Sequence, residues 1–269
     1  MTGLRVYVEG VGLWSPQLAS FASLRSLLAG STPQPPAPRP AAAMLPPNVR
    51  RRAPESVLLA VEVASQAVAM SGRDAGTLAC VFASSHGDQA ITDYMCATLA
   101  QAPAELSPIR FHNSVHNAPV GYWTIASGCH APSTSVAAQR ATFGAGLLEA
   151  ATQALTEQRP VLLVCSDTDG CGPLREVTGC TQSFGCALVL SPTAGPATLA
   201  QLDVQLTAPR AAGALDEPLA DWSTANPSAT SLPLLALLAT SEGRCQVAAA
   251  PGLGLEIHLK VVHVGEPVS

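Results

Sequence analysis

Residues 133–165, STSVAAQRATFGAGLLEAATQALTEQRPVLLVC, carry the pattern that decides the fold. Residues 133–138 suggest a short strand, residues 143–155 place apolar side chains at helical spacing, and residues 161–165 are an unbroken apolar run. A strand, a helix and a second buried strand in succession are typical of a layered α/β fold. We therefore expect a mixed sheet with helices packed on it.

The same alternation continues on both sides of this stretch. Residues 4–9 predict a first strand, which we expect Gly10 and Gly12 to close. Further strands are predicted over residues 77–84, 186–190 and 200–206, and a closing hairpin over 245–264. Helices are predicted over residues 20–28, 55–70, 90–100, 112–125 and 231–238.

The chain length favours one large domain. We expect residues 1–269 to form a single domain, in which residues 193–269 are a C-terminal extension with elements too short to fold separately. Residues 31–47 contain seven prolines, so this segment is predicted to be an exposed loop or a lid.

Composition excludes several classes of protein. A formal charge of −5 argues against nucleic-acid binding, which needs a net basic face. No stretch has the about 18–20 uncharged apolar residues of a membrane span, and the start MTGLRVYVEGVG lacks the pattern of a signal peptide. We therefore expect a cytoplasmic protein, whose eight cysteines are mostly small buried hydrophobes rather than disulfides.

Two motifs suggest cofactors and are rejected. Gly10 and Gly12 follow a strand, but Ser15 stands at the third glycine position of a dinucleotide-binding turn. His112 and His116 are four residues apart, so a helix would place both on one face, yet no third metal ligand accompanies them. We expect neither a cofactor nor a metal.

Cys129 is the strongest candidate for a reactive thiol. An adjacent imidazole, here His130, can lower the pKa of a thiol and make it a better nucleophile. Neighbours in extended structure seldom point at each other, however, so a buried, inert thiol is the rival interpretation. His116 and His112 are further candidates for acid–base chemistry.

Three stretches together resemble the β-ketoacyl synthases, a family with a thiolase-like fold. Residues 5–32, RVYVEGVGLWSPQLASFASLRSLLAGST, resemble the family's opening strand, glycine turn and first helix. Residues 111–135, FHNSVHNAPVGYWTIASGCHAPSTS, resemble the segment before the nucleophile. Residues 137–155 followed by 160–168 resemble the nucleophile helix and the strand after it. The resemblance covers residues 5–190 and implies a layered half-ketosynthase fold.

The departures from the family bear on catalysis. The resemblance places Gln139 where the family has its cysteine nucleophile, with Ala138 and Arg140 as the adjacent registers. His258 and His263 lack the surroundings of the family's two catalytic histidines, so the extension is degenerate. A Claisen condensation needs a thiolate and imidazoles that stabilise developing charge, and this chain is therefore not expected to condense by that route.

The resemblance implies an auxiliary role, like that of a chain length factor in fatty-acid, aryl-polyene or polyketide elongation. It implies pairing with an active ketosynthase, or with a second copy, through the strand at residues 133–138. An acyl carrier protein is a further expected partner, which the basic run Arg50–Arg52 would attract. The alternatives are an acyltransferase or thioesterase that uses Cys129 or His116, and a non-catalytic acyl-binding scaffold.

Overall fold

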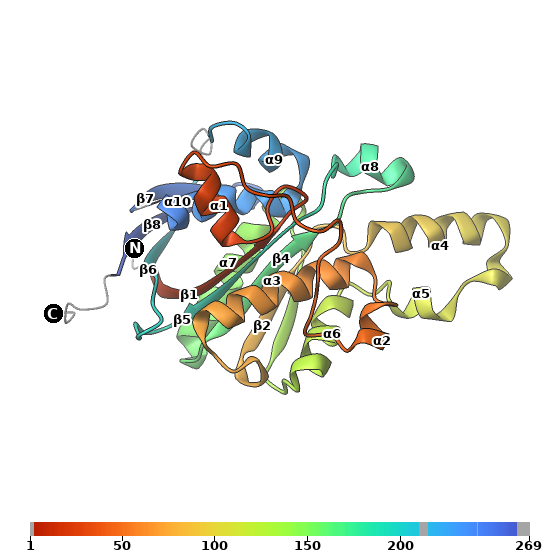
Figure 1. Cartoon of the computed structure of the whole chain (residues 1–269), viewed down its shortest axis with the longest axis horizontal. Helices are drawn as coiled ribbons and strands as arrows, with labels where there is room; N and C mark the ends of the chain where they lie inside the picture. Colours follow the sequence, from red (N-terminus) through yellow and green to blue (C-terminus); the bar gives the residue numbers. More distant parts are fainter. Residues whose placement is uncertain (1–2, 210–214, 241, 263–269) are drawn as a thin grey trace.

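The computed structural model describes residues 3–209, 215–240 and 242–262. Within these residues eight strands form one mixed sheet in the order β3-β2-β4-β5-β1-β6-β8-β7 (Figure 1). The strands are β1 (Leu4–Trp14), β2 (Ala79–Ala83), β3 (Ser133–Val136), β4 (Val161–Asp167), β5 (Phe184–Ser191), β6 (Ala200–Thr207), β7 (Gly243–Ala250) and β8 (Leu253–Val261). β2, β3 and β4 run parallel, and the other pairings are antiparallel.

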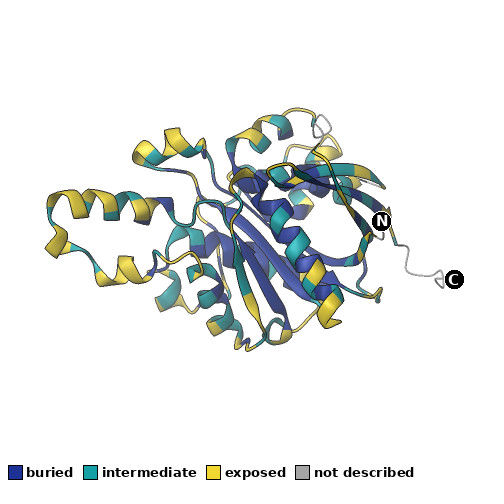
Figure 2. Cartoon of the chain, turned by 180° about the vertical axis from the view of Figure 1, so that it is seen from behind, coloured by how far each residue is buried: buried dark blue, intermediate teal, exposed yellow. Residues whose placement is uncertain are grey.

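Helices cover both faces of this sheet. They are α1 (Phe21–Leu28), α2 (Pro47–Arg50), α3 (Glu55–Ser71), α4 (Gln89–Gln101), α5 (Pro108–His112), α6 (Ala118–Ser127), α7 (Thr142–Glu157), α8 (Gly172–Thr178), α9 (Leu219–Ala225) and α10 (Leu232–Thr240). α3 and α6 share one apolar core with the sheet, and α1, α7 and α10 share the other. The central strands are buried on both faces, as Figure 2 shows in dark blue. The predicted α/β layers are therefore confirmed.

β4 shows how the sequence pattern produces this layering. Leu162 and Val164 pack in the core under α3, whereas Val161, Leu163 and Cys165 pack in the core under α7. Side chains alternate between the two faces of a strand, so an unbroken apolar run supplies both cores.

β1 extends further than predicted. It continues through Gly10 and Gly12 to Trp14, so the expectation that these glycines end the strand is wrong. A Cβ at Gly10 or Gly12 would lie 2.0 Å from the carbonyl oxygen of Ala67 or Val63 on α3. The glycines are therefore needed for close helix packing rather than for a turn.

The predicted helix over residues 112–125 is confirmed only from Ala118 onward, and the prediction is wrong for residues 113–117. α5 ends at His112, and α6 begins at Ala118 with Pro119 in its first turn. Proline has no backbone N–H and is tolerated at a helix start but not in its interior. His112 and His116 consequently do not share a helix face.

The C-terminal part of the described chain completes the same core. β6 pairs with β1, and the predicted hairpin is present as β7 and β8, although residues 263 and 264 lie outside the described residues. α7 contacts β2 and β4 as well as β7, so it lies between the two ends of the sheet. A Cβ at Gly144 of α7 would lie 2.1 Å from the carbonyl oxygen of Ala248.

The proline-rich segment over residues 31–47 is mostly exposed and has no regular structure before α2. It is attached to the body at Ala42, which is buried and whose backbone N–H donates to Glu62 Oε2 of α3 at 2.7 Å. The predicted exposed loop is present, held down near its C-terminal end. None of the described helices has the length and apolar character needed to cross a membrane.

Candidate functional site

The parallel strands β2, β3 and β4 end at one edge of the sheet. Parallel strands place their carboxyl ends together, and loops there position functional groups in many α/β folds. Ser84 follows β2, Gln139 follows β3, and Asp167 ends β4. This edge is the candidate site.

Asp167 connects the segments of the site. Its Oδ1 accepts hydrogen bonds from the Ser84 hydroxyl at 2.8 Å, the Ser85 N–H at 2.8 Å and the His86 N–H at 3.2 Å. Its Oδ2 accepts from the Ser228 hydroxyl at 2.6 Å. The carboxyl group therefore joins the loop after β2 to the turn before α10.

Burial dominates the electrostatics of Asp167. Only 2% of the residue is exposed, and burial raises the pKa of Asp167, while hydrogen bonds from Ser228 and Ser84 oppose the rise. Asn226 supports the same junction, since its amide donates to the carbonyls of Asp167 at 2.8 Å and Gln182 at 2.7 Å. Neither Asp167 nor this junction was predicted from the sequence, although an acidic residue at the end of a predicted apolar strand was a visible signal.

Gln139 lies in a tight turn that leads into α7. Its φ is +51°, a left-handed conformation that residues other than glycine seldom adopt. Its carbonyl accepts from the Ser85 hydroxyl at 2.7 Å and the Thr142 hydroxyl at 2.6 Å, and the Thr142 Oγ1 in turn accepts from the Ala138 N–H at 2.9 Å. These bonds hold a strained turn, and the Gln139 side chain is exposed.

The side chain presented by this turn limits its chemistry. A neutral carboxamide can donate and accept hydrogen bonds, but it is not a nucleophile comparable to a thiolate. The neighbouring Ser85 hydroxyl already donates to the Gln139 carbonyl. The geometry of the site therefore supports binding and positioning, and it does not support covalent transfer at residue 139.

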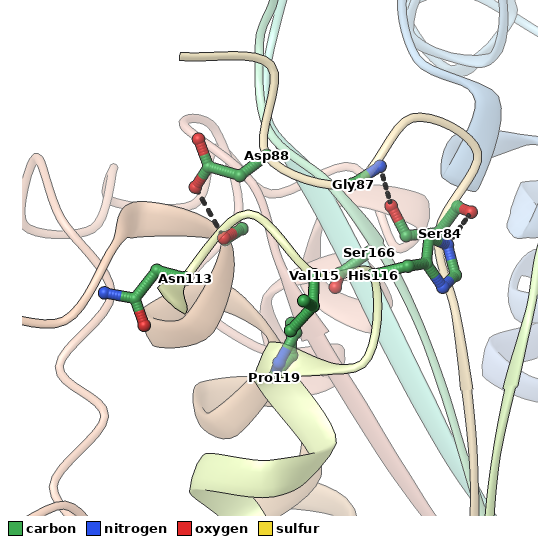
Figure 3. Close-up of a pocket in the computed structure, with 9 residues that line it drawn as sticks. Ser84, Gly87, Asp88, Asn113, Val115, His116, Pro119 and Ser166 are labelled. Atoms are coloured by element: carbon green, nitrogen blue, oxygen red, sulfur yellow. Dashed lines mark hydrogen bonds between the residues drawn. The ribbon is translucent and has the colours of Figure 1, made fainter. Parts of the chain in front are cut away.

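The structure separates the candidate histidines. His116 Nε2 lies 2.8 Å from the Ser84 carbonyl oxygen, and both residues line a cavity of about 10 Å³ (Figure 3). That volume is sufficient for about one water molecule. His112 ends α5, His258 lies in β8 with Nε2 3.1 Å from Glu256 Oε1, and His263 lies outside the described residues. Of the candidate histidines that the structure describes, only His116 thus makes a side-chain hydrogen bond at this edge.

Cys129 has the environment of a buried thiol. It is 6% exposed, and its Sγ lies 3.2 Å from the Leu78 carbonyl oxygen, to which it donates. The Cys80 thiol donates to the same carbonyl at 3.3 Å. His130, by contrast, is exposed to solvent.

We expect Cys96 to be the first cysteine modified by iodoacetamide. It is the exposed cysteine, on α4, whereas burial raises the pKa to about 12 for Cys80, Cys180, Cys186 and Cys245. A time course at neutral pH, read by peptide mass spectrometry, should show Cys96 modified and Cys129 largely intact. Cys96→Ser should slow modification of the folded chain strongly and leave the partly exposed Cys171 and Cys245 as the remaining sites. Rapid, selective modification of Cys129 would contradict this assignment and would support an enzyme that uses this thiol.

The described residues contain no group of three or more His, Cys, Asp or Glu side chains placed to hold a metal ion. All eight cysteines are free thiols.

Comparison with known proteins identifies the architecture. A family model described as the N-terminal domain of β-ketoacyl synthases matches residues 27–251. The curated proteins that were compared include no match. The observed layers thus agree with the thiolase-like fold that the sequence resemblance implied.

Three solved structures illustrate the similarity. A chain from the complex of the ketosynthase ApeO with its chain length factor ApeC, from Xenorhabdus doucetiae, is 24% identical with a TM-score of 0.72, covering 95% of this chain and 99% of that chain. A chain from the AntDE:AntF complex, a type II polyketide synthase carrier protein with its ketosynthase, is 12% identical with a TM-score of 0.71. The match covers 97% of this chain and 100% of that chain. The ishigamide ketosynthase/chain length factor is 12% identical with a TM-score of 0.67, and the match covers 97% of this chain and 100% of that chain. At these identities the similarity is one of fold.

Proposed function

Because this chain belongs to the β-ketoacyl synthase N-terminal domain family, we propose that it is a non-condensing auxiliary partner of an active ketosynthase. In this role it resembles a chain length factor of acyl-chain elongation, of the fatty-acid, aryl-polyene or polyketide type. The proposed place of action is the cytoplasm, a reducing compartment in which eight unpaired cysteines remain thiols.

The observation that carries the proposal is Gln139. The turn before α7 has a left-handed residue held by Ser85 and Thr142, but its side chain is an amide. A ketosynthase that acts by covalent catalysis needs a nucleophile at the corresponding place. A retained turn without a nucleophile fits a chain that contributes structure while its partner contributes the chemistry.

β3 offers a surface for that partner. It is an edge strand, paired with β2 on one side within the described part of the chain. Pro132 and Val136 accept hydrogen bonds from Cys80 and Ser84, so alternate residues face β2 and Ser135 faces the open side. An unpaired edge of this kind is a template for a strand from another chain.

Exposed apolar side chains on α4 and α5 also support a protein partner. α4 and α5 project from the body of the molecule (Figure 1) and are largely exposed. Leu99, Ile109 and Phe111 are 50%, 67% and 58% exposed on this projection. Large apolar side chains gathered on one projection are typical of a protein interface.

Ser135→Pro should weaken pairing with the ketosynthase at least about tenfold, because proline has no N–H to donate to a strand on the open side. The measurement is co-expression with a ketosynthase of the same pathway, followed by native mass spectrometry of the purified complex. Ser135→Ala keeps the backbone donor and should pair like the unmodified chain. A chain that stays monomeric with every ketosynthase tested, or equal pairing by the two variants, would contradict the proposal.

The carrier protein would dock on the basic run at the end of α2. Arg51 and Arg52 are exposed and make no ion pair or hydrogen bond through their side chains in the described structure. An acidic carrier protein would be attracted to such unpaired charges in a salt-dependent manner. Native mass spectra are also recorded with the carrier protein added. The Arg51→Glu/Arg52→Glu variant is expected to lose the bound carrier protein in these spectra.

A further inference from the structure

The first part of the proline-rich segment, residues 32–40, is held in an extended conformation by its own sequence. It lies between α1 and α2 (Figure 1), with proline at positions 33, 35, 36, 38 and 40. Every other residue from 32 to 39 directly precedes a proline. Proline fixes its own φ at about −65° and biases the residue before it toward the polyproline II region. The sequence therefore favours a polyproline II helix before any partner binds.

Burial along the segment follows the repeat of such a helix. Pro33 and Pro36 are half-buried, whereas Pro35, Ala37 and Pro38 are exposed. A polyproline II helix has three residues per turn, so residues three apart share one edge. The body of the protein thus covers the edge of Pro33 and Pro36, and the edge of Pro35 and Pro38 faces solvent.

The segment is tied to the body at both ends. The Ser31 N–H donates to the Ser26 carbonyl at 2.9 Å, and the Ala42 N–H donates to Glu62 Oε2 at 2.7 Å. Between these ties, residues 32–40 make no hydrogen bond with another described residue. The backbone carbonyls of this stretch are therefore available as acceptors for a partner.

The charge around the segment is basic, although the whole chain carries −5. Residues 31–53 contain no acidic residue and four arginines, which are Arg39, Arg50, Arg51 and Arg52. Arg39 is exposed, and burial raises the pKa of the nearby Glu55 while Arg39 opposes the rise. Arg50 Nη1 donates to the Ala41 carbonyl at 3.4 Å, so the basic run adjoins the same end of the segment. A partner for this surface should carry carboxylates.

We propose that residues 32–40 are the docking ligand of a protein domain that has an aromatic-lined groove flanked by carboxylates. Pro35 and Pro38 enter the groove, and Arg39 faces the carboxylates. Grooves of this kind bind polyproline II segments, and a segment that is already extended loses little conformational entropy on binding. The partner is neither the ketosynthase nor the carrier protein, so the inference goes beyond the proposed function.

The test is calorimetric titration of the full chain with an SH3 domain whose proline groove is flanked by aspartate and glutamate side chains. The SH3 domain should saturate one site, and the same domain with one groove aromatic residue changed to alanine should not bind measurably. Pro35→Ala/Pro38→Ala should weaken binding at least about tenfold, because it removes both exposed rings and frees the backbone. Arg39→Gln should also weaken binding, and its effect should shrink as the salt concentration rises.

Pro173→Ala/Pro196→Ala is the matched control. Both prolines are exposed and lie outside the segment, so this variant should bind the SH3 domain like the unmodified chain. Circular dichroism confirms that each variant is folded. The absence of saturable binding, or equal binding by the two double variants, would overturn the proposal. Pairing with the ketosynthase should be the same for both double variants, so the two proposals fail separately.

Discussion

Gly12→Ala is expected to destabilise the chain by more than about 4 kcal/mol, enough to prevent folding of a typical domain. The new Cβ would lie 2.0 Å from the carbonyl oxygen of Val63 and 2.8 Å from its carbonyl carbon. Both are backbone atoms in the middle of α3, where most residues between Val57 and Val68 are buried. The helix would have to move away from β1, and the core on that face would lose its close packing.

Gly121→Ala is the matched control. Gly121 lies within α6, and nothing is found within 4 Å of a Cβ built there. Alanine is the better helix former, so this variant should be unchanged or up to about 1 kcal/mol more stable. Urea unfolding followed by circular dichroism measures both. A Gly12→Ala protein with the midpoint of the unmodified chain would show that α3 does not approach β1 as closely as described.

Asp167→Ala is expected to cost about 3–5 kcal/mol and to disorder the Gln139 turn. The substitution leaves donors without an acceptor, among them the buried hydroxyl of Ser228 and the partly buried hydroxyl of Ser84. Ser85, whose N–H donates to Asp167, also donates its hydroxyl to the Gln139 carbonyl. Losing the carboxylate therefore releases the loop that holds the strained residue, and hydrogen exchange of residues 84–88 should accelerate.

The matched control is Asp203→Ala, which removes a carboxylate paired with the exposed Arg5. A surface pair of this kind contributes about 1 kcal/mol or less.

Because burial raises the pKa of Asp167, the protonated form of this residue favours the folded state. Its contribution to the stability of the fold declines as the pH rises through the folded-state pKa. The loss in free energy of unfolding caused by Asp167→Ala should thus be larger at acidic pH. Equal stability of the two variants at every pH would contradict the proposed junction.

The layers of the fold were determined by the sequence alone. Apolar runs at 77–84, 161–165 and 186–190 became β2, β4 and β5, because a strand buried on both faces needs apolar side chains at every position. The helical spacing over 55–70 and 143–155 became α3 and α7 for the same local reason. The prediction that residue 139 stands in the turn before α7, without a thiol, needed only the order of motifs along the chain.

Tertiary structure alone decided the close contact between β1 and α3, the Asp167 junction and the separation of the two histidines. Gly12 continues β1 and lets α3 pack closely against this strand. The contact residues of α3 lie about fifty residues further along the chain, so no local sequence pattern predicts this contact. Asp167 became the centre of the site because Ser84 and Ser228, remote in sequence, converge on one buried carboxyl group. His112 and His116 were separated because Pro119 starts a new helix. Local propensity acts over a few residues, whereas packing and burial join segments from the whole chain.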